Sequence, residues 1–155
     1  MHAAVLLVLL GMWPSASGSG YQVRSSEEIF QTLRAAVQVG QFPTDDQLLD
    51  LGFRKRPDVG LEMNSEDGRL HVLIQGNNRN VFTMTWSPKE PPPSMHDSML
   101  AALITKSSRL ELIGRERMKI VINEQNDGSV IFREGFIVDV VDGKLRSTIV
   151  EALAH

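Results

Sequence analysis

The sequence predicts an α+β fold in which helices pack on an antiparallel sheet made of a three-strand meander, a helix and two or three more strands. Three observations support this class. The spacing of apolar residues changes from a period of 3.6 before residue 52 to a period of 2 from residue 59 onward. Asp-Gly pairs, which favour hairpin turns, occur at residues 67–68 and 127–128. A proline-rich stretch at residues 87–93 cannot continue a sheet, so it separates two groups of strands.

Length and composition restrict the class of protein before any motif is considered. The chain has 155 residues, of which 42% are hydrophobic, so it is long enough for one folded domain and is not a disordered chain. A net charge of −3 provides no basic surface for nucleic acid. Because the chain has no cysteine, disulfides, thiolate metal sites and cysteine nucleophiles are excluded.

The first twenty residues differ from the rest of the chain. Residues 3–13 are an unbroken apolar run, and Pro14 and six small residues follow it. The run is shorter than the roughly 20 residues that cross a bilayer, but it fits the core of a secretory signal. We therefore predict that residues 1–18 are a signal peptide, that residues 19–155 are a single α+β domain, and that the protein is exported to the periplasm or secreted, with no stable membrane span. No Lys or Arg precedes the run, as one usually does in a signal peptide. The alternatives are that the run is an edge strand or a buried helix, or that the start codon has been placed too far upstream.

Two helices are expected at the start of the domain. Ser25 and Glu28 have the spacing of a capping box, and apolar residues follow at helical spacing until Gly40. Thr44 and Gln47 form a second capping box, which predicts a short helix.

The next segment predicts a meander with one solvent-facing side. Strands are expected at residues 59–64, 69–75 and 81–86, joined by turns at 65–68 and 76–80. Apolar residues alternate with polar ones along these strands, as expected when one side of a sheet faces the core.

The second half of the domain is expected to begin and end with a helix. Ser94 is the predicted N-cap of an amphipathic helix, and residues 110–113 fit either its extension or a short strand. A hairpin at residues 118–133 follows, and residues 136–141 prolong or bend its second strand. Residues 144–154 predict a closing helix. The apolar residues of that helix are Leu145, Ile149 and Leu153.

The basic run at residues 54–56 has no interleaved aromatic residues, so it is interpreted as a solvated loop rather than a nucleic-acid contact.

Two stretches resemble a known superfamily. They are residues 61–70, with the sequence LEMNSEDGRL, and residues 118–132, with the sequence MKIVINEQNDGSVIF. A strand, an Asp-Gly turn and a strand near each end of the domain, with an amphipathic helix between them, are similar to the type III secretion chaperone-like superfamily, which includes the bacterial sensory-transduction-regulator (YbjN-type) family. The resemblance covers residues 21–155 and implies a non-enzymatic domain that binds another protein, often as a homodimer. The predicted export departs from the cytoplasmic setting of the secretion chaperones.

Catalytic and metal-binding motifs are weak in this sequence, so no catalytic residue, cofactor or metal is predicted. It has no nucleophile elbow, no paired-histidine metal motif and no glycine-rich loop before a helix. Met95 and Met99 lie one helical turn apart, and thioethers suit Cu(I), but core packing is the preferred interpretation of this pair. An alternative is an enzyme or small-ligand site built from scattered polar residues. The candidates are His71, Thr83, Thr85, Arg133 and Asp139.

Burial provides the main argument for function. Several strands have apolar residues on both sides, so both faces of the sheet must be covered by helices or by another subunit. We predict an exported, non-catalytic interaction domain of a chaperone-like or regulatory kind. It is expected to bind another protein, to form a homodimer and not to bind nucleic acid. The expected interaction surface consists of Leu73, Met95, Met99, Val121, Ile137 and Val141.

Overall fold

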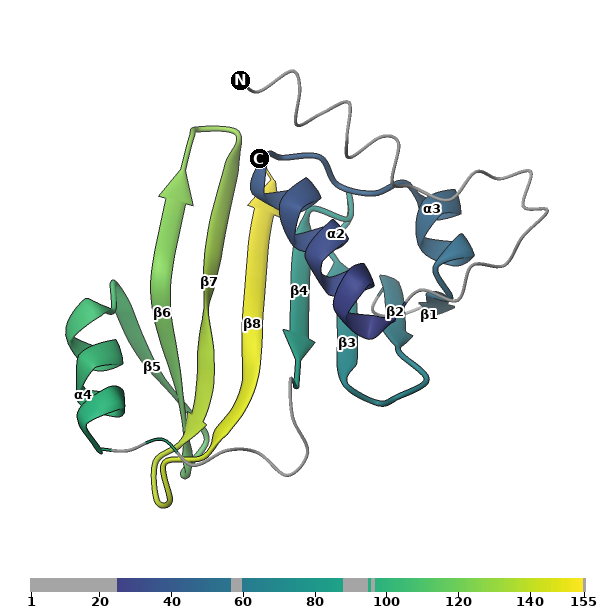
Figure 1. Ribbon diagram of the computed structural model, residues 1–155. Helices are drawn as coiled ribbons and strands as arrows, with labels where there is room; N and C mark the ends of the chain where they lie inside the picture. The colour runs from purple at the N-terminus through teal and green to yellow at the C-terminus, as the bar shows by residue number, and fades with distance from the viewer. Residues whose placement is uncertain (1–24, 57–59, 88–94, 96, 155) are drawn as a thin grey trace.

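The computed structural model describes residues 25–56, 60–87, 95 and 97–154. They form one eight-stranded antiparallel sheet and three helices, which confirms the predicted α+β class (Figure 1). The helices are α2 (Ser26–Gln38), α3 (Asp45–Asp50) and α4 (Asp97–Lys106). The strands are β1 (Arg54–Arg56), β2 (Gly60–Asn64), β3 (Leu70–Gln75), β4 (Val81–Trp86), β5 (Arg109–Ile113), β6 (Arg117–Asn126), β7 (Val130–Asp139) and β8 (Leu145–Ala154). The predicted signal peptide and the predicted N-cap Ser94 lie outside the described residues.

The sheet consists of two four-stranded meanders joined in the middle. The strand order is β1-β2-β3-β4-β8-β7-β6-β5, so neighbours in sequence are neighbours in space except where β4 meets β8. That junction runs from the pair Val81 and Leu153 to the pair Trp86 and Thr148. The edges of the sheet are therefore β1 and β5.

The core lies between α2 and the sheet. Ser25 caps the helix by accepting a hydrogen bond from the Glu28 amide, as predicted. The buried apolar residues of α2 are Ile29, Phe30, Leu33, Ala36 and Val37. They face fully buried residues of four strands, Val72, Phe82, Phe132 and Val150. We call this the helix-bearing face of the sheet. The opposite face, on which none of the three described helices lies, is called the helix-free face.

The capping box predicted for the second helix is confirmed, with both of its hydrogen bonds. The Thr44 hydroxyl accepts a hydrogen bond from the Gln47 amide, and the Gln47 side chain accepts one from the Thr44 amide. The short helix α3 buries Leu48 in the core.

The helix α4 lies on the same face as α2, at the other end of the sheet. Glu134 of β7 binds Arg34 of α2, and Phe136, two residues further along β7, points to the same side. Phe136 lines a hollow together with residues of α4. Figure 1 shows α4 beside β5, apart from α2 and α3. None of the three described helices is both long enough and apolar enough to cross a bilayer.

The prediction of a closing helix at residues 144–154 is wrong. These residues form β8, which lies between β4 and β7 in the centre of the sheet. Ile149 is nearly buried on the helix-free face and Val150 is buried on the other, so the segment lacks a clear alternation of apolar and polar residues. Pairing with strands on both sides decides the conformation here, and helical spacing does not.

Three other segments differ from the sequence-based expectation. Residues 54–56, expected as a loop, form the edge strand β1, with all three side chains exposed. The ambiguous residues 110–113 belong to a strand, β5. β7 runs without interruption through Gly135. Because residues 109–113 and 145–154 also form strands, the second half has four strands rather than two or three.

Candidate functional site

The six residues of the expected interaction surface lie in three separate places. Leu73, Val121 and Ile137 alternate onto the helix-free face, as their cross-strand partners show. Met95 and Met99 lie beside and on α4. The sixth residue, Val141, is not in a strand at all but follows β7 in a turn, where 84% of its surface is exposed. The structure therefore does not unite the predicted surface.

Val121, one of the six, is buried in the single chain, where only 1% of its surface is exposed. It pairs with Gly135, which has no side chain, and the ammonium group of Lys119 reaches across β7 at this level to Glu151 on β8. Long charged side chains therefore shelter the helix-free face where no helix covers it. Leu73 and Ile137 are half-buried on the same face.

Charged side chains on the helix-free face pair with one another. The Nζ atom of Lys119 lies 2.8 Å from Oε1 of Glu151 and 2.9 Å from Oε2 of Glu111. Burial opposes the charge of Lys119, but these two carboxylates outweigh it and raise the pKa of the ammonium group. The hydrogen bond from Lys119 lowers the pKa of Glu111. Groups already paired in this way offer few free charges to a ligand.

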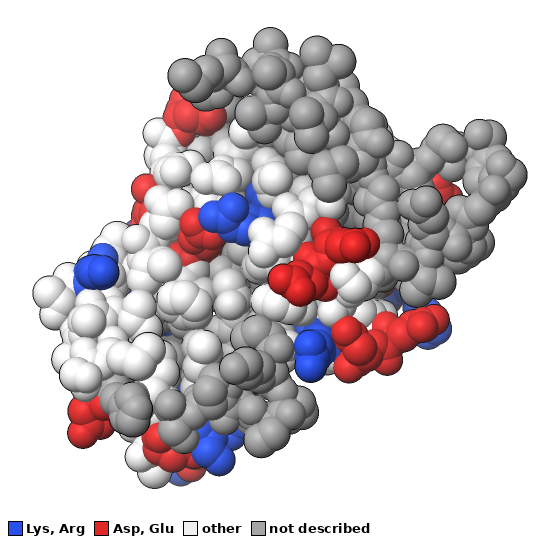
Figure 2. All heavy atoms as spheres, viewed as in Figure 1, with Lys and Arg blue, Asp and Glu red and all other residues white. Residues whose placement is uncertain are grey.

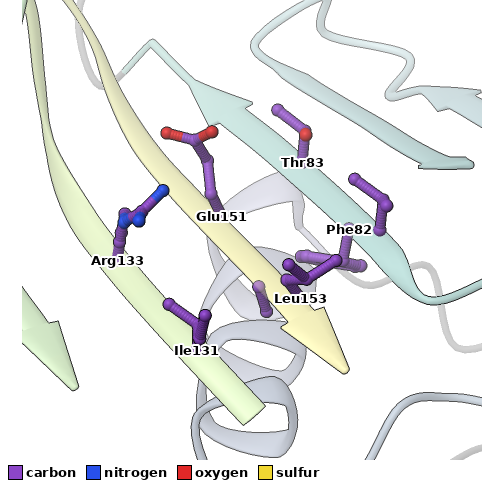
Figure 3. Close-up of a pocket in the computed structure, with 8 residues that line it drawn as sticks. Phe82, Thr83, Ile131, Arg133, Glu151 and Leu153 are labelled. Atoms are coloured by element: carbon purple, nitrogen blue, oxygen red, sulfur yellow. The ribbon is translucent and has the colours of Figure 1, made fainter. Parts of the chain in front are cut away.

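A hollow of about 170 Å³ lies on this face between β4, β8 and β7. Figure 3 shows Arg133 and Glu151 pointing out of neighbouring strands at its rim, with Thr83 on the far side of β8. Its lining contains neither histidine nor cysteine, so it lacks the usual base and the usual thiol nucleophile of covalent catalysis.

The scattered polar residues considered for an enzyme are only partly brought together. Thr83 and Arg133 share the hollow, whereas His71 lies near Glu62 at 3.3 Å and Asp139 is held by Arg146 at 2.5 Å. Thr85 pairs with His71 across β3 and β4. The sequence reasoning missed Glu151 as a member of the hollow, because it placed this residue in a helix.

Most of the exposed large apolar residues lie on α4, on β5 and in the β7–β8 turn. No residue of α4 is buried, although six of its ten residues are apolar. The six exposed residues, with their exposed fractions, are Met99 (54%), Leu110 (45%), Leu112 (76%), Ile113 (41%), Val140 (49%) and Val141 (84%). We call them the α4–β5 surface.

Two backbone hydrogen bonds hold the parts of this surface together. The Val140 amide donates to the Glu116 carbonyl, which ties the β7–β8 turn to the turn after β5. The Met95 amide donates to the Gly143 carbonyl, which ties the same turn to the segment before α4. In Figure 2 the side of the molecule where α4 lies consists largely of uncharged atoms.

A hollow of about 330 Å³ opens within this area. Met95 and Met99 both line it, and the other lining residues are Ala102, Leu103, Lys106, Phe136 and Leu145. The two thioethers thus share an almost wholly apolar environment, which favours packing over Cu(I) ligation. In the described part of the chain, no group of three or more His, Cys, Asp or Glu residues is placed to hold a metal. His96 lies outside the described residues.

Comparison with known proteins adds nothing to this geometry: no protein-family model, no curated protein and no solved structure matches the chain.

Proposed function

We propose that this chain is an exported, non-catalytic interaction domain that binds another protein through its α4–β5 surface. The observation behind the proposal is the concentration of exposed apolar side chains at one corner. Ten large apolar side chains are exposed in the described part of the chain, and six of them belong to this surface. Leu110 and Leu112 point to the face that bears α4, and Ile113 points to the opposite face of the same edge strand. Exposed apolar residues scattered singly are ordinary, whereas several gathered on neighbouring elements are typical of a protein-binding site.

The edge strand β5 strengthens the proposal. Its outer side pairs with no strand among the described residues, so its backbone amides and carbonyls are available to a partner. A partner strand added there gains backbone hydrogen bonds, and Leu110 and Leu112 provide apolar contacts beside them.

Export is the second part of the proposal. It rests on the apolar run at residues 3–13 and on the small residues that follow. Intact-mass measurement of the protein recovered from its host should show the loss of residues 1–18. A cytosolic product that retains them would overturn this part and leave the binding surface untouched.

Site-specific photo-crosslinking in the native host tests the binding surface. A photoreactive residue at Leu112, which is 76% exposed, should form a crosslink to protein. The control position is Leu49 on α3, which is 47% exposed but lies away from the α4–β5 surface. Equal crosslinking at both positions, or none at Leu112, would overturn the proposal.

A further inference from the structure

We propose that the partner at the α4–β5 surface is a second copy of this chain, whose β5 strand pairs antiparallel with β5 about a two-fold axis at Leu110. The inference rests on the proposed function, because it names the occupant of the same surface. Three observations support it. They are the charges on the two edge strands, the pairing registers that a two-fold axis allows, and the charges that face each other in each register.

Only one of the two edges suits self-association. β1 consists of Arg54, Lys55 and Arg56, all exposed, and Arg56 is paired with Glu62 of the neighbouring strand β2. Antiparallel pairing of two copies of this edge would still place only basic residues opposite one another. β5 has the sequence Arg-Leu-Glu-Leu-Ile, which mixes both signs of charge with apolar residues. Two copies of β5 are therefore able to attract each other, whereas two copies of β1 repel.

Symmetry restricts the register to a few choices. A two-fold axis perpendicular to the sheet places one residue opposite its own copy and keeps opposite residues on the same face. For β5 the central positions are Leu110, Glu111 and Leu112. Each choice determines which charges meet across the interface.

The charges of β5 select Leu110. With the axis at Leu110, Arg109 lies opposite Glu111 of the second copy, and this ion pair occurs twice. With the axis at Glu111, two carboxylates oppose each other. With the axis at Leu112, Glu111 lies opposite Ile113 of the second copy, and no charged residues of β5 face each other. Opposite charges on facing strands stabilise a sheet and like charges destabilise it, so only the register at Leu110 gains ion pairs between the two strands.

The two side chains have room to form these pairs. Within the single chain, Glu111 lies 2.9 Å from Lys119 and Arg109 lies 3.5 Å from Glu124. Even so, the side chains of Arg109 and Glu111 remain 43% and 40% exposed, so an ion pair to the second copy adds to these contacts. Leu110 and Leu112 lie on the same face as α4, because they pair with Ile120 and Met118 of the helix-bearing face. The pairing therefore covers both leucines and brings the two α4 helices to either side of the axis.

Introduced cysteines test the register directly, because the chain has none of its own. In the proposed register Leu110 faces its own copy, with Cα atoms about 4.5–5.5 Å apart, a separation that a disulfide spans. Leu112 is four residues from its own copy, which is about 13 Å. Under mild oxidation the Leu110→Cys protein should become a disulfide-linked dimer, and the matched Leu112→Cys protein should remain unlinked. Linkage of Leu112→Cys alone would overturn the register.

Charge exchange tests the same pairing in solution. By sedimentation equilibrium on the processed protein, Arg109→Glu or Glu111→Arg alone should weaken the dimer by roughly tenfold or more, since each change sets like charges opposite each other. The double exchange should restore the dimer, and Arg54→Glu at the other edge should leave it intact. Thermal unfolding of each variant shows whether the fold is kept.

The outcomes separate this inference from the proposed function. A strictly monomeric protein, or a dimer that the double exchange fails to restore, overturns the β5 pairing. If the photoreactive residue at Leu112 still crosslinks to a different protein in that case, the binding surface stands and its occupant is not a second copy.

Discussion

Arg34 on α2 and Glu134 on β7 form a two-point ion pair across 100 residues of sequence. The Nε atom of Arg34 lies 2.6 Å from Oε2 of Glu134, and its Nη2 atom lies 2.7 Å from Oε1. Asn123 of β6 donates a third hydrogen bond to the same carboxylate, at 3.0 Å. The guanidinium group also lies over the ring of Phe132, 5.9 Å from its centre. This contact fixes the first helix to the second meander.

Removing the guanidinium group of Arg34 should destabilise the protein. Arg34→Met leaves Glu134, whose side chain is only 16% exposed, without its main partner. We expect the free energy of unfolding to fall by about 1–3 kcal/mol in a urea titration. The control is Lys144→Met, at an exposed pair 3.9 Å long, which should cost less than about 0.5 kcal/mol. An equal effect of the two changes would contradict the structural role of Arg34.

Acidic pH should lower the free energy of unfolding. Burial pushes the pKa of Glu134 upward, but the hydrogen bonds from Arg34 and Asn123 outweigh it, so the net pKa lies below the ordinary value of 4.5. The pKa of Asp67 also lies below its ordinary value of 3.8, because the hydroxyls of Ser26 and Ser65 and an amide donate to it. A carboxylate with a lowered pKa in the folded state stabilises the protein above the unfolded pKa, and this contribution is lost as the pH falls through the folded pKa.

The unfolding free energy should therefore stay level down to about pH 5 and decrease below it. Urea titrations over this range measure the change. Glu134→Gln should reduce the steepness of the decrease, since one of the titrating groups is gone. A protein that gains stability on acidification would contradict the assignment.

If residues 145–154 form the strand β8 rather than a helix, Val150 and Leu153 should contribute differently to stability. Val150 is fully buried in the sheet, whereas 36% of Leu153 is exposed. Val150→Ala should cost about 2 kcal/mol, because two buried methyl groups are lost and a cavity remains. Leu153→Ala should cost less than about 1 kcal/mol. The opposite order, measured by chemical unfolding, would favour a helix with Leu153 in its apolar stripe.

Gly135 is required where β7 passes β6. A Cβ atom at this position would lie 1.9 Å from the Ile120 carbonyl oxygen and 2.9 Å from the Val121 Cα atom, and both are backbone atoms. Gly135→Ala should therefore lower the unfolding free energy by about 1–3 kcal/mol, as overpacking does elsewhere. A variant as stable as the parent would show that the strands separate at low cost.

The sequence predicts β2, β3 and β4 of the first meander well, because the buried residues of each strand alternate with more exposed ones. In β3, buried Val72 and Ile74 alternate with the half-buried residues His71 and Leu73. β8 has no such signal. It lies between two strands, and Ile149 and Val150 are buried on opposite faces, so apolar residues follow one another and their spacing imitates a helix.

The candidate site could be predicted only in part, because the sequence does not reveal the central position of β8. Met95 and Met99 were expected at a surface, and they do line a hollow there. Leu110 and Leu112 were not, since their exposure depends on β5 being an edge, and β5 is an edge only because β8 joins the meanders on the other side. Which strand ends a sheet is a property of the whole topology and cannot be read from the five residues of the strand.

The place of β8 has a consequence for the sheet as a whole. It follows all seven other strands in sequence, yet it alone links β4 to β7. Each of β4 and β7 gains its second strand partner only through β8, so the continuity of the whole sheet depends on this last strand.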